Sequence, residues 1–184
     1  KLYSACRCWF SLLYFGHDIE KLYILNGGLK KWKQENKVLT SKKTNIVKSN
    51  YRAFKKDNYV FKMSQINENI NSNNLVVVDA RSLKRFNGEI EEPRKGLRKG
   101  HIKNSLCLPY GECINQTTNE FKTNDELKLI FEELIKTRNN NKFVFTCGSG
   151  VTASVLAYAY KMINNEYEPI IYDGSWSEYG KYSP

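Results

Sequence analysis

The residue best suited to chemistry is Cys147, in the stretch Lys142 to Thr152, KFVFTCGSGVT. A short apolar strand, Phe143 to Phe145, leads into it, two glycines follow within three residues, and a helical pattern begins near Val151. A cysteine at such a turn lies where backbone N–H groups converge and where the helix dipole places partial positive charge. Both effects favour thiolate over thiol, so the sequence favours a nucleophilic sulfur over a buried structural cysteine.

The cysteine count and the charge restrict the possible environments and partners. Five cysteines without framework spacing, and only two histidines, argue against a disulfide scaffold and against a zinc site. We therefore expect a free thiol in a reducing compartment, cytoplasmic or mitochondrial. The net charge of +10 comes from lysines scattered among asparagines, which favours a solvated surface over a nucleic-acid partner. No apolar run is long enough to cross a bilayer, so no membrane partner is expected.

The apolar pattern predicts helices that alternate with strands. This order is typical of an α/β fold with a central, mainly parallel sheet flanked by helices. Leu75 to Ala80, LVVVDA, is a continuous β-branched run, as in a strand that is buried on both faces. Helices are expected over 4–15, 29–35, 63–70, 124–137 and 152–163, further strands over 21–25, 59–62, 143–145 and 169–172, and a surface loop over 81–99.

The chain also contains an internal repeat. Ser4 to Trp32 aligns without a gap with Val151 to Tyr179, at an offset of 147 residues. The strand and turn YILNGGLKKW lies over IIYDGSWSEY, so that Asn26 matches Asp173. We therefore expect the end of a first domain (1–36), a linker (37–58) and a complete second copy (59–184). In this interpretation the chain begins inside a domain, so targeting signals cannot be assessed.

Three segments resemble the rhodanese superfamily, and in particular the two-domain 3-mercaptopyruvate sulfurtransferases. They are VVVDARSLKRFNGEIEEPRKGLRKGHIKNSLCLP, the loop CGSGVTA and the closing YDGSWSEYG. The resemblance implies tandem rhodanese-like domains, of which the first is inactive and the second carries the catalytic Cys147. The six-residue loop that starts at Cys147 has the sulfurtransferase length. The related phosphatases use a longer loop that ends in arginine, so phosphoryl chemistry is disfavoured.

The resemblance also implies substrate-binding positions. Arg85 in RFNG and Arg94 in EEPR would hold a carboxylate, because a guanidinium binds one through two parallel hydrogen bonds. The loop residues Gly148, Ser149, Gly150, Val151 and Thr152 would surround the donor. Thiosulfate transferases resemble one another in basic residues after the cysteine, whereas Gly148 and Ser149 are small and neutral, which favours mercaptopyruvate. We expect a positive φ at Gly150 and backbone N–H groups from Val151 and Thr152.

Further side chains are expected to support the site. Asp79 would brace the loop or an arginine, His101 in GHIKNS would pack, and Trp176 would wall the pocket. Arg98 is expected to be solvated, and Cys113 lies in a polar sequence where oxidation is conceivable.

Together these features predict a sulfurtransferase that moves sulfane sulfur from 3-mercaptopyruvate to a thiol or cyanide through a persulfide on Cys147. A thiol acceptor such as thioredoxin is the family expectation, and no metal or organic cofactor is required. Two alternatives stay open at this point. One is a thiosulfate sulfurtransferase, and the other is a non-catalytic rhodanese module that carries sulfur, for example in tRNA thiolation.

Overall fold

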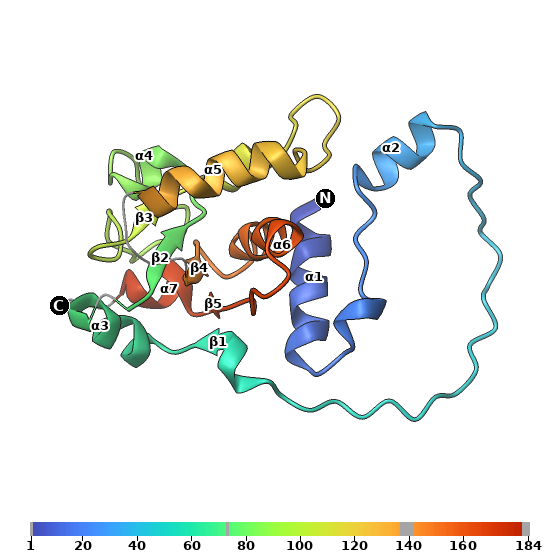
Figure 1. The fold of residues 1–184 in the computed structure, drawn as a ribbon, viewed down its shortest axis with the longest axis horizontal. Helices are drawn as coiled ribbons and strands as arrows, with labels where there is room; N and C mark the ends of the chain where they lie inside the picture. The colour runs from blue at the N-terminus through green and yellow to red at the C-terminus, as the bar shows by residue number, and fades with distance from the viewer. Residues whose placement is uncertain (1, 73, 137–141, 182–184) are drawn as a thin grey trace.

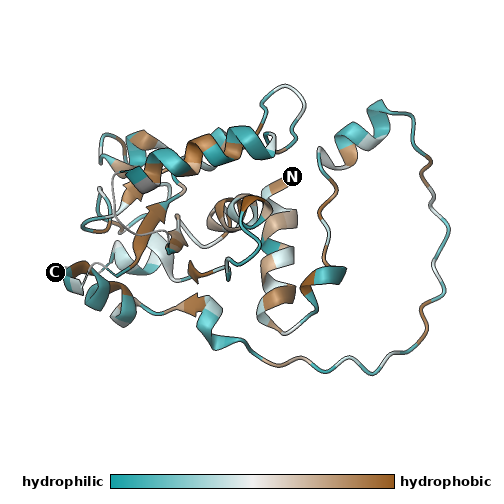
Figure 2. Cartoon of the chain, viewed as in Figure 1, coloured by the Kyte–Doolittle hydropathy of each residue, from teal (hydrophilic) through white to brown (hydrophobic). Residues whose placement is uncertain are grey.

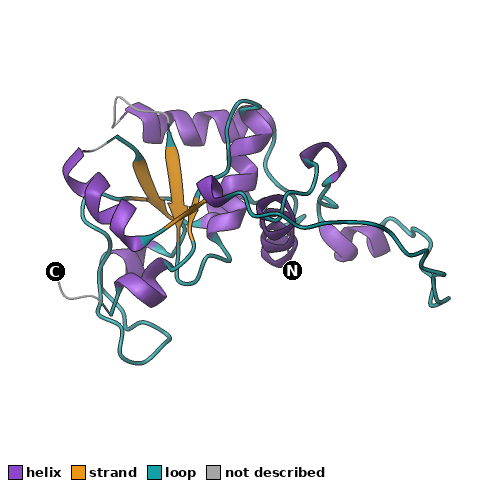
Figure 3. Ribbon diagram, turned by 90° about the horizontal axis from the view of Figure 1, so that it is seen from below, coloured by secondary structure: helices purple, strands orange, loops and turns teal. Residues whose placement is uncertain are grey.

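The structure, a computed structural model, describes residues 2–72, 74–136 and 142–181. Its centre is a parallel sheet of five strands in the order β1-β5-β4-β2-β3, which Figure 3 shows enclosed by helices. The strands are β1 (Val60–Phe61), β2 (Val76–Asp79), β3 (Leu106–Cys107), β4 (Phe143–Thr146) and β5 (Ile171–Tyr172). The predicted α/β class with a parallel sheet is therefore confirmed.

Helices cover both faces of this sheet. Val76, Val78, Phe143 and Phe145 point into a core shared with α1, α5 and α6, whereas Val77 and Val144 point toward α3 and α7. This alternation follows from the period of two along each strand. The helices are α1 (Leu2–Tyr14), α2 (Gly28–Gln34), α3 (Met63–Ser72), α4 (Leu83–Phe86), α5 (Asn124–Lys136), α6 (Ala153–Ile163) and α7 (Ser175–Tyr179), with 3-10 turns η1 (Ile19–Lys21), η2 (Asp57–Tyr59) and η3 (Tyr110–Cys113).

Helix α5 shows why a local pattern was sufficient to predict an element. Its N-terminus has a capping box, in which Glu126 Oε2 accepts the Thr123 N–H at 2.8 Å and Thr123 Oγ1 accepts the Glu126 N–H at 3.3 Å. Its apolar residues fall on one side, visible as a brown face beside a teal one in Figure 2. The predicted last residue, Thr137, lies outside the described residues.

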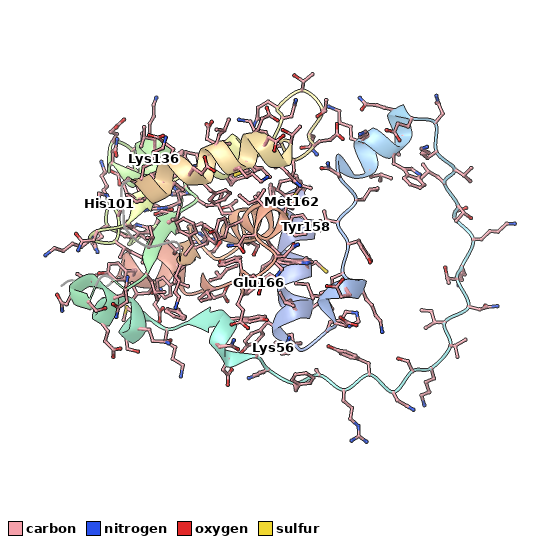
Figure 4. All side chains as sticks on the ribbon, in the orientation of Figure 1. Lys56, His101, Lys136, Tyr158, Met162 and Glu166 are labelled. Carbon is pink, nitrogen blue, oxygen red and sulfur yellow. The ribbon has the colours of Figure 1, made fainter. Side chains whose placement is uncertain are left out.

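The N-terminal segment packs directly on the body that carries Cys147. Helix α1 lies beside α6 (Figure 1), and Figure 4 labels Tyr158 of α6 near α1. The Trp9 and Tyr158 rings meet edge to face with centroids 5.0 Å apart. Residues 37–56 form neither helix nor strand, and Figure 1 shows them swinging away from the body before they return to β1. Residues 57–58, the last of the linker expected over 37–58, belong to η2.

One expected strand is absent, and the expected long loop contains a helix. Residues 21–25 were predicted to form a strand, but they follow η1 as an irregular segment in which Tyr23 is 84% exposed. Their repeat counterpart forms β5, which lies between β1 and β4. A strand needs neighbours to pair with, and within the described chain this segment has none. In the loop predicted over 81–99, the short helix α4 presents Arg85.

Candidate active site

Cys147 follows β4 directly, at the carboxyl end of the parallel strands. The residue is 2% exposed, and its sulfur accepts a hydrogen bond from the Ser149 N–H at 3.4 Å. Gly150 has a φ of 73°, which confirms the predicted positive φ and turns the chain toward α6. The sulfur is therefore held at a strand-to-helix turn with at least one backbone donor directed at it.

Ser175, which the sequence analysis did not single out, holds the turn from Cys147 to Gly150 through its hydroxyl group. Its Oγ accepts the Gly150 N–H at 2.9 Å and the Cys147 N–H at 3.4 Å, and donates to the Tyr172 carbonyl at 2.9 Å. The Thr146 hydroxyl also donates to Ser175 Oγ, at 3.4 Å, so this one hydroxyl is bonded on its donor side and on its acceptor side. Ser175 is fully buried with a φ of 53°, a conformation that L-residues rarely adopt. The repeat offered a signal, because Ser175 aligns with Gly28, whose φ is 62°.

Helix α7 holds the other side of the loop. The Trp176 N–H donates to the Cys147 carbonyl at 2.9 Å, and the Gly148 carbonyl accepts from the Ser177 N–H at 3.0 Å and from its Oγ at 2.5 Å. Trp176 was predicted to wall the pocket, but its side chain is 1% exposed and packs behind the loop. Its contribution at Cys147 is therefore made by its backbone.

Two guanidinium groups lie beside the residue that follows the cysteine. An ideal Cβ on Gly148 would lie 3.1 Å from Arg85 Nη2 and 3.7 Å from Arg94 Nη1. Arg94 is exposed, and among the described residues it has neither an ion-pair nor a hydrogen-bond partner. Both predicted clamp residues are therefore brought to the same place, and a larger or basic residue at position 148 would meet Arg85.

A buried carboxylate sets the direction of Arg85, and sequence reasoning did not identify it. The Glu92 side chain is 2% exposed and pairs with Arg85 Nη2 at 2.5 Å and with Arg81 Nη1 at 2.8 Å. Arg81 also donates to both oxygens of Asp79: to Oδ2 from Nε at 2.9 Å and from Nη2 at 2.7 Å, and to Oδ1 from Nε at 3.1 Å. Asp79 thus braces an arginine, as predicted. The chain Asp79–Arg81–Glu92–Arg85 links the end of β2 to the arginine beside Gly148.

Other predicted residues lie apart from this constellation. His101 is exposed and stacks on Phe86 with ring centroids 3.9 Å apart, and Figure 4 shows it on the side of the molecule opposite α1. It is a packing histidine, as expected. The prediction that Arg98 is solvated was wrong, because its guanidinium lies 4.6 Å from the Trp176 ring centroid. Val151 and Thr152 precede α6, which begins one residue later than predicted.

All five cysteines are free; Cys6, Cys113 and Cys147 are buried, and Cys107 is partly buried. Desolvation raises the pKa of Cys6, Cys107 and Cys113 to about 12, so each stays a thiol near neutral pH. Cys113, in a polar sequence, is the last residue of η3 and its side chain is fully buried, which protects it from oxidants. The exposed cysteine is Cys8.

Within the described part of the chain no group of three or more His, Cys, Asp or Glu residues could hold a metal ion. A search of the same residues for a helix long and apolar enough to span a bilayer also finds none. The candidate site therefore consists of the Cys147 sulfur at a strand-to-helix turn and the Arg85 and Arg94 guanidinium groups beside Gly148. This combination can attack a sulfur atom in a small molecule that carries a carboxylate.

Comparison with known proteins agrees with this geometry. The rhodanese-like domain model matches residues 62–182. The 3-mercaptopyruvate sulfurtransferases of Escherichia coli (strain K12) and Homo sapiens are each 36% identical to the chain over 97% of its length. The chain spans 62% and 58% of these two relatives.

A solved structure supports the same assignment. SseA from Escherichia coli, whose crystal structure is described under the fold and mechanism of 3-mercaptopyruvate sulfotransferases, superposes with a TM-score of 0.76 at 34% identity. The match covers 96% of this chain and 64% of that one. The chain therefore belongs to the rhodanese family.

Proposed function

We propose that the chain is the part of a sulfurtransferase that carries the reactive sulfur and transfers sulfur from 3-mercaptopyruvate to a thiol or cyanide. The observation that carries this proposal is the position of the Arg85 and Arg94 guanidinium groups beside Gly148, the residue that follows Cys147. A donor with a carboxylate at one end and a thiol at the other fits two cations and a nucleophile. The activity of the family members named above supports it.

The chemistry proceeds in two displacements on sulfur. In the first, the Cys147 thiolate attacks the donor's sulfur, an S–S bond forms, and the C–S bond breaks with its electron pair on carbon. The resulting enolate takes up the proton from the donor's thiol and leaves as pyruvate. Cys147 keeps a persulfide, whose negative charge is stabilised by the nearby backbone N–H and guanidinium groups.

In the second displacement an acceptor thiolate attacks the outer sulfur. The S–S bond of the persulfide breaks, its electron pair returns to Cys147 as thiolate, and the acceptor leaves as a persulfide. This is a ping-pong sequence with a covalent intermediate on the cysteine. We propose a small thiol or a dithiol protein such as thioredoxin as the acceptor.

The small loop favours mercaptopyruvate over thiosulfate. Thiosulfate is a compact dianion without a carboxylate, and basic side chains in the loop itself, directly after the cysteine, would suit it better. The residues after Cys147 are Gly148 and Ser149, and a side chain at position 148 would crowd Arg85. We therefore expect kcat/KM to be higher for mercaptopyruvate.

We also propose the domain division expected from the sequence. Residues 1–36 would be the end of a first rhodanese-like domain, residues 37–58 a linker, and residues 59–184 the domain that carries Cys147. The internal repeat supports it, as does the extent of the family match, residues 62–182.

Intact mass spectrometry after incubation with mercaptopyruvate tests the proposal. We expect the mass to increase by one sulfur atom, pyruvate to appear in equal amount, and both to be absent in Cys147→Ser. The variant Cys8→Ser is the matched control, because it removes the exposed cysteine and should retain the adduct. An unchanged mass, or a sulfur adduct that survives Cys147→Ser, would refute the proposal.

A further inference from the structure

A cation from the N-terminal segment contacts the loop that begins at Cys147. Arg7 lies on α1 and donates from both of its terminal nitrogens to the two oxygens of Asp173, with Nη2 3.2 Å from Oδ2. Its Nη1 also lies 3.4 Å from the carbonyl oxygen of Gly150. A guanidinium with two nitrogens engaged is held in a fixed orientation. One side chain therefore joins α1 to both the Cys147 loop and the turn after β5.

The Gly150 carbonyl is held from both repeats at once. Besides Arg7, it accepts a hydrogen bond from Ser154 Oγ at 3.0 Å. Arg7 and Ser154 occupy equivalent positions of α1 and α6 in the internal repeat. The packing is close, because an ideal Cβ on Gly150 would lie 2.7 Å from Arg7 Nη1 and would overlap Asp173. The loop therefore has no room to move toward α1 while Arg7 stays in place.

The charges are consistent with this arrangement. The pKa of Arg7 is raised, first by the hydrogen bond to Asp173 and also by the negative charges of Asp173 and of a Cys147 thiolate, against the effect of desolvation. The Arg7 side chain is 32% exposed, so solvent screens these interactions only in part. A positive charge is thus held beside Gly150, whereas Arg85 lies beside Gly148.

We propose that Arg7 is a positioning residue for sulfur transfer: it fixes the Gly150 carbonyl and Asp173, and through them the turn that directs the Ser149 N–H at the Cys147 sulfur. The proposal rests on the proposed function and adds a contribution from α1 to it. Arg7 is not assigned a contact with the donor. Its loss should therefore lower the rate of the chemical step and leave KM for the donor nearly unchanged.

The test compares Arg7→Met with a matched variant in the full chain. Lys31→Met is the control. Lys31 pairs with Glu120, so this ion pair also joins the N-terminal segment to the body that carries Cys147, and the two side chains are 34% and 24% exposed. Neither residue contacts the loop that begins at Cys147. Single-turnover persulfide formation is followed by intact mass, and iodoacetamide alkylation of Cys147 by peptide mass. We expect Arg7→Met to slow both by about 10- to 100-fold with unchanged final amplitude. Lys31→Met should stay within about twofold in both rates.

Two results would overturn the proposal: rates for Arg7→Met within twofold of the unchanged chain, or equal slowing by Lys31→Met. A loss of amplitude at an unchanged rate would also overturn it, since that indicates misfolding rather than positioning. Where Arg7→Met does not fold, Arg7→Lys decides, because it keeps the charge but cannot bind both Asp173 oxygens. It should slow alkylation several-fold, and an unchanged rate would refute the proposal. Alkylation needs no sulfur donor, so it remains informative if the proposed function itself fails.

Discussion

Comparing Ser175→Ala with Ser175→Gly separates the backbone strain at Ser175 from the loss of the hydrogen bonds of its hydroxyl. In Ser175→Ala the buried Gly150 N–H loses its acceptor at 2.9 Å, and the Cys147 N–H loses a weaker one at 3.4 Å. A buried donor left without a partner costs about 1–3 kcal/mol. Alanine also keeps a side chain at a φ of 53°. We expect the free energy of unfolding to fall by about 2–3 kcal/mol.

Ser175→Gly loses the same hydrogen bonds but removes the backbone strain. Adopting a left-handed conformation costs an L-residue roughly 1–2 kcal/mol, and glycine avoids this. We therefore expect Ser175→Gly to be more stable than Ser175→Ala by about 1 kcal/mol. For a chain of this size, that difference corresponds to roughly 2–4 °C in Tm. The repeat counterpart Gly28 already adopts this conformation, with a φ of 62°.

Activity should not follow stability in this pair. Both variants release the turn that holds Cys147, so both should form persulfide about 10- to 100-fold more slowly, although glycine is the more stable. Ser105→Ala is the control, because it also removes a buried hydroxyl bonded to a carbonyl, that of Ile102, outside the Cys147 turn. It should lower Tm without slowing the reaction. A fully active Ser175→Gly would refute this account, and so would a Ser175→Ala that is the more stable of the two.

Three further predictions concern Glu92, Gly150 and the cysteines. Glu92→Gln breaks the buried ion pair with Arg85 and should lower the free energy of unfolding, measured by denaturant titration, by about 3 kcal/mol. It should also raise KM for mercaptopyruvate, because Arg85 is no longer held in place. An unchanged KM would contradict the role of Glu92. Gly150→Ala should abolish persulfide formation, since φ is 73° and its Cβ would overlap Asp173; any activity above a tenth would contradict it. Burial raises the pKa of Cys6, Cys107 and Cys113 to about 12, so iodoacetamide at pH 8 should label Cys147 and Cys8 but not these three. The unfolded chain loses those protons first as pH rises from about 9, so the free energy of unfolding should fall above that pH. Labelling of Cys6, Cys107 or Cys113 at pH 8 would contradict this account.

The elements that sequence predicted well are those specified by local pattern. The run Leu75 to Ala80 contains β2 (Val76–Asp79), because its β-branched residues suit a strand buried on both faces, and the apolar run Phe143 to Phe145 begins β4. The segment 21–25 has an equally strand-like composition and forms none. Its structure depends on whether neighbouring strands exist, and composition does not contain that information.

The residues of the candidate site also divide into those that a local pattern identifies and those that it does not. The turn at Cys147 is local, so the strand, the glycines and the helix start were sufficient to identify it. The clamp by Arg85 and Arg94 followed from family resemblance, since spacing alone does not distinguish them from surface arginines. Glu92 is one of two adjacent glutamates, and nothing in the sequence tells which of them is buried.

The residues that hold the turn are the hardest to predict because they come from distant parts of the chain. Gly150 receives its contacts from Arg7, at a separation of 143 residues, and from Ser175, at a separation of 25. Such contacts exist only once α1 has packed on α6 and β5 has paired with β4. The candidate cysteine can therefore be recognised from a short motif, whereas the geometry that holds its turn is a property of the folded chain. Substitutions at Arg7 and Ser175 test that difference, because both leave the motif intact.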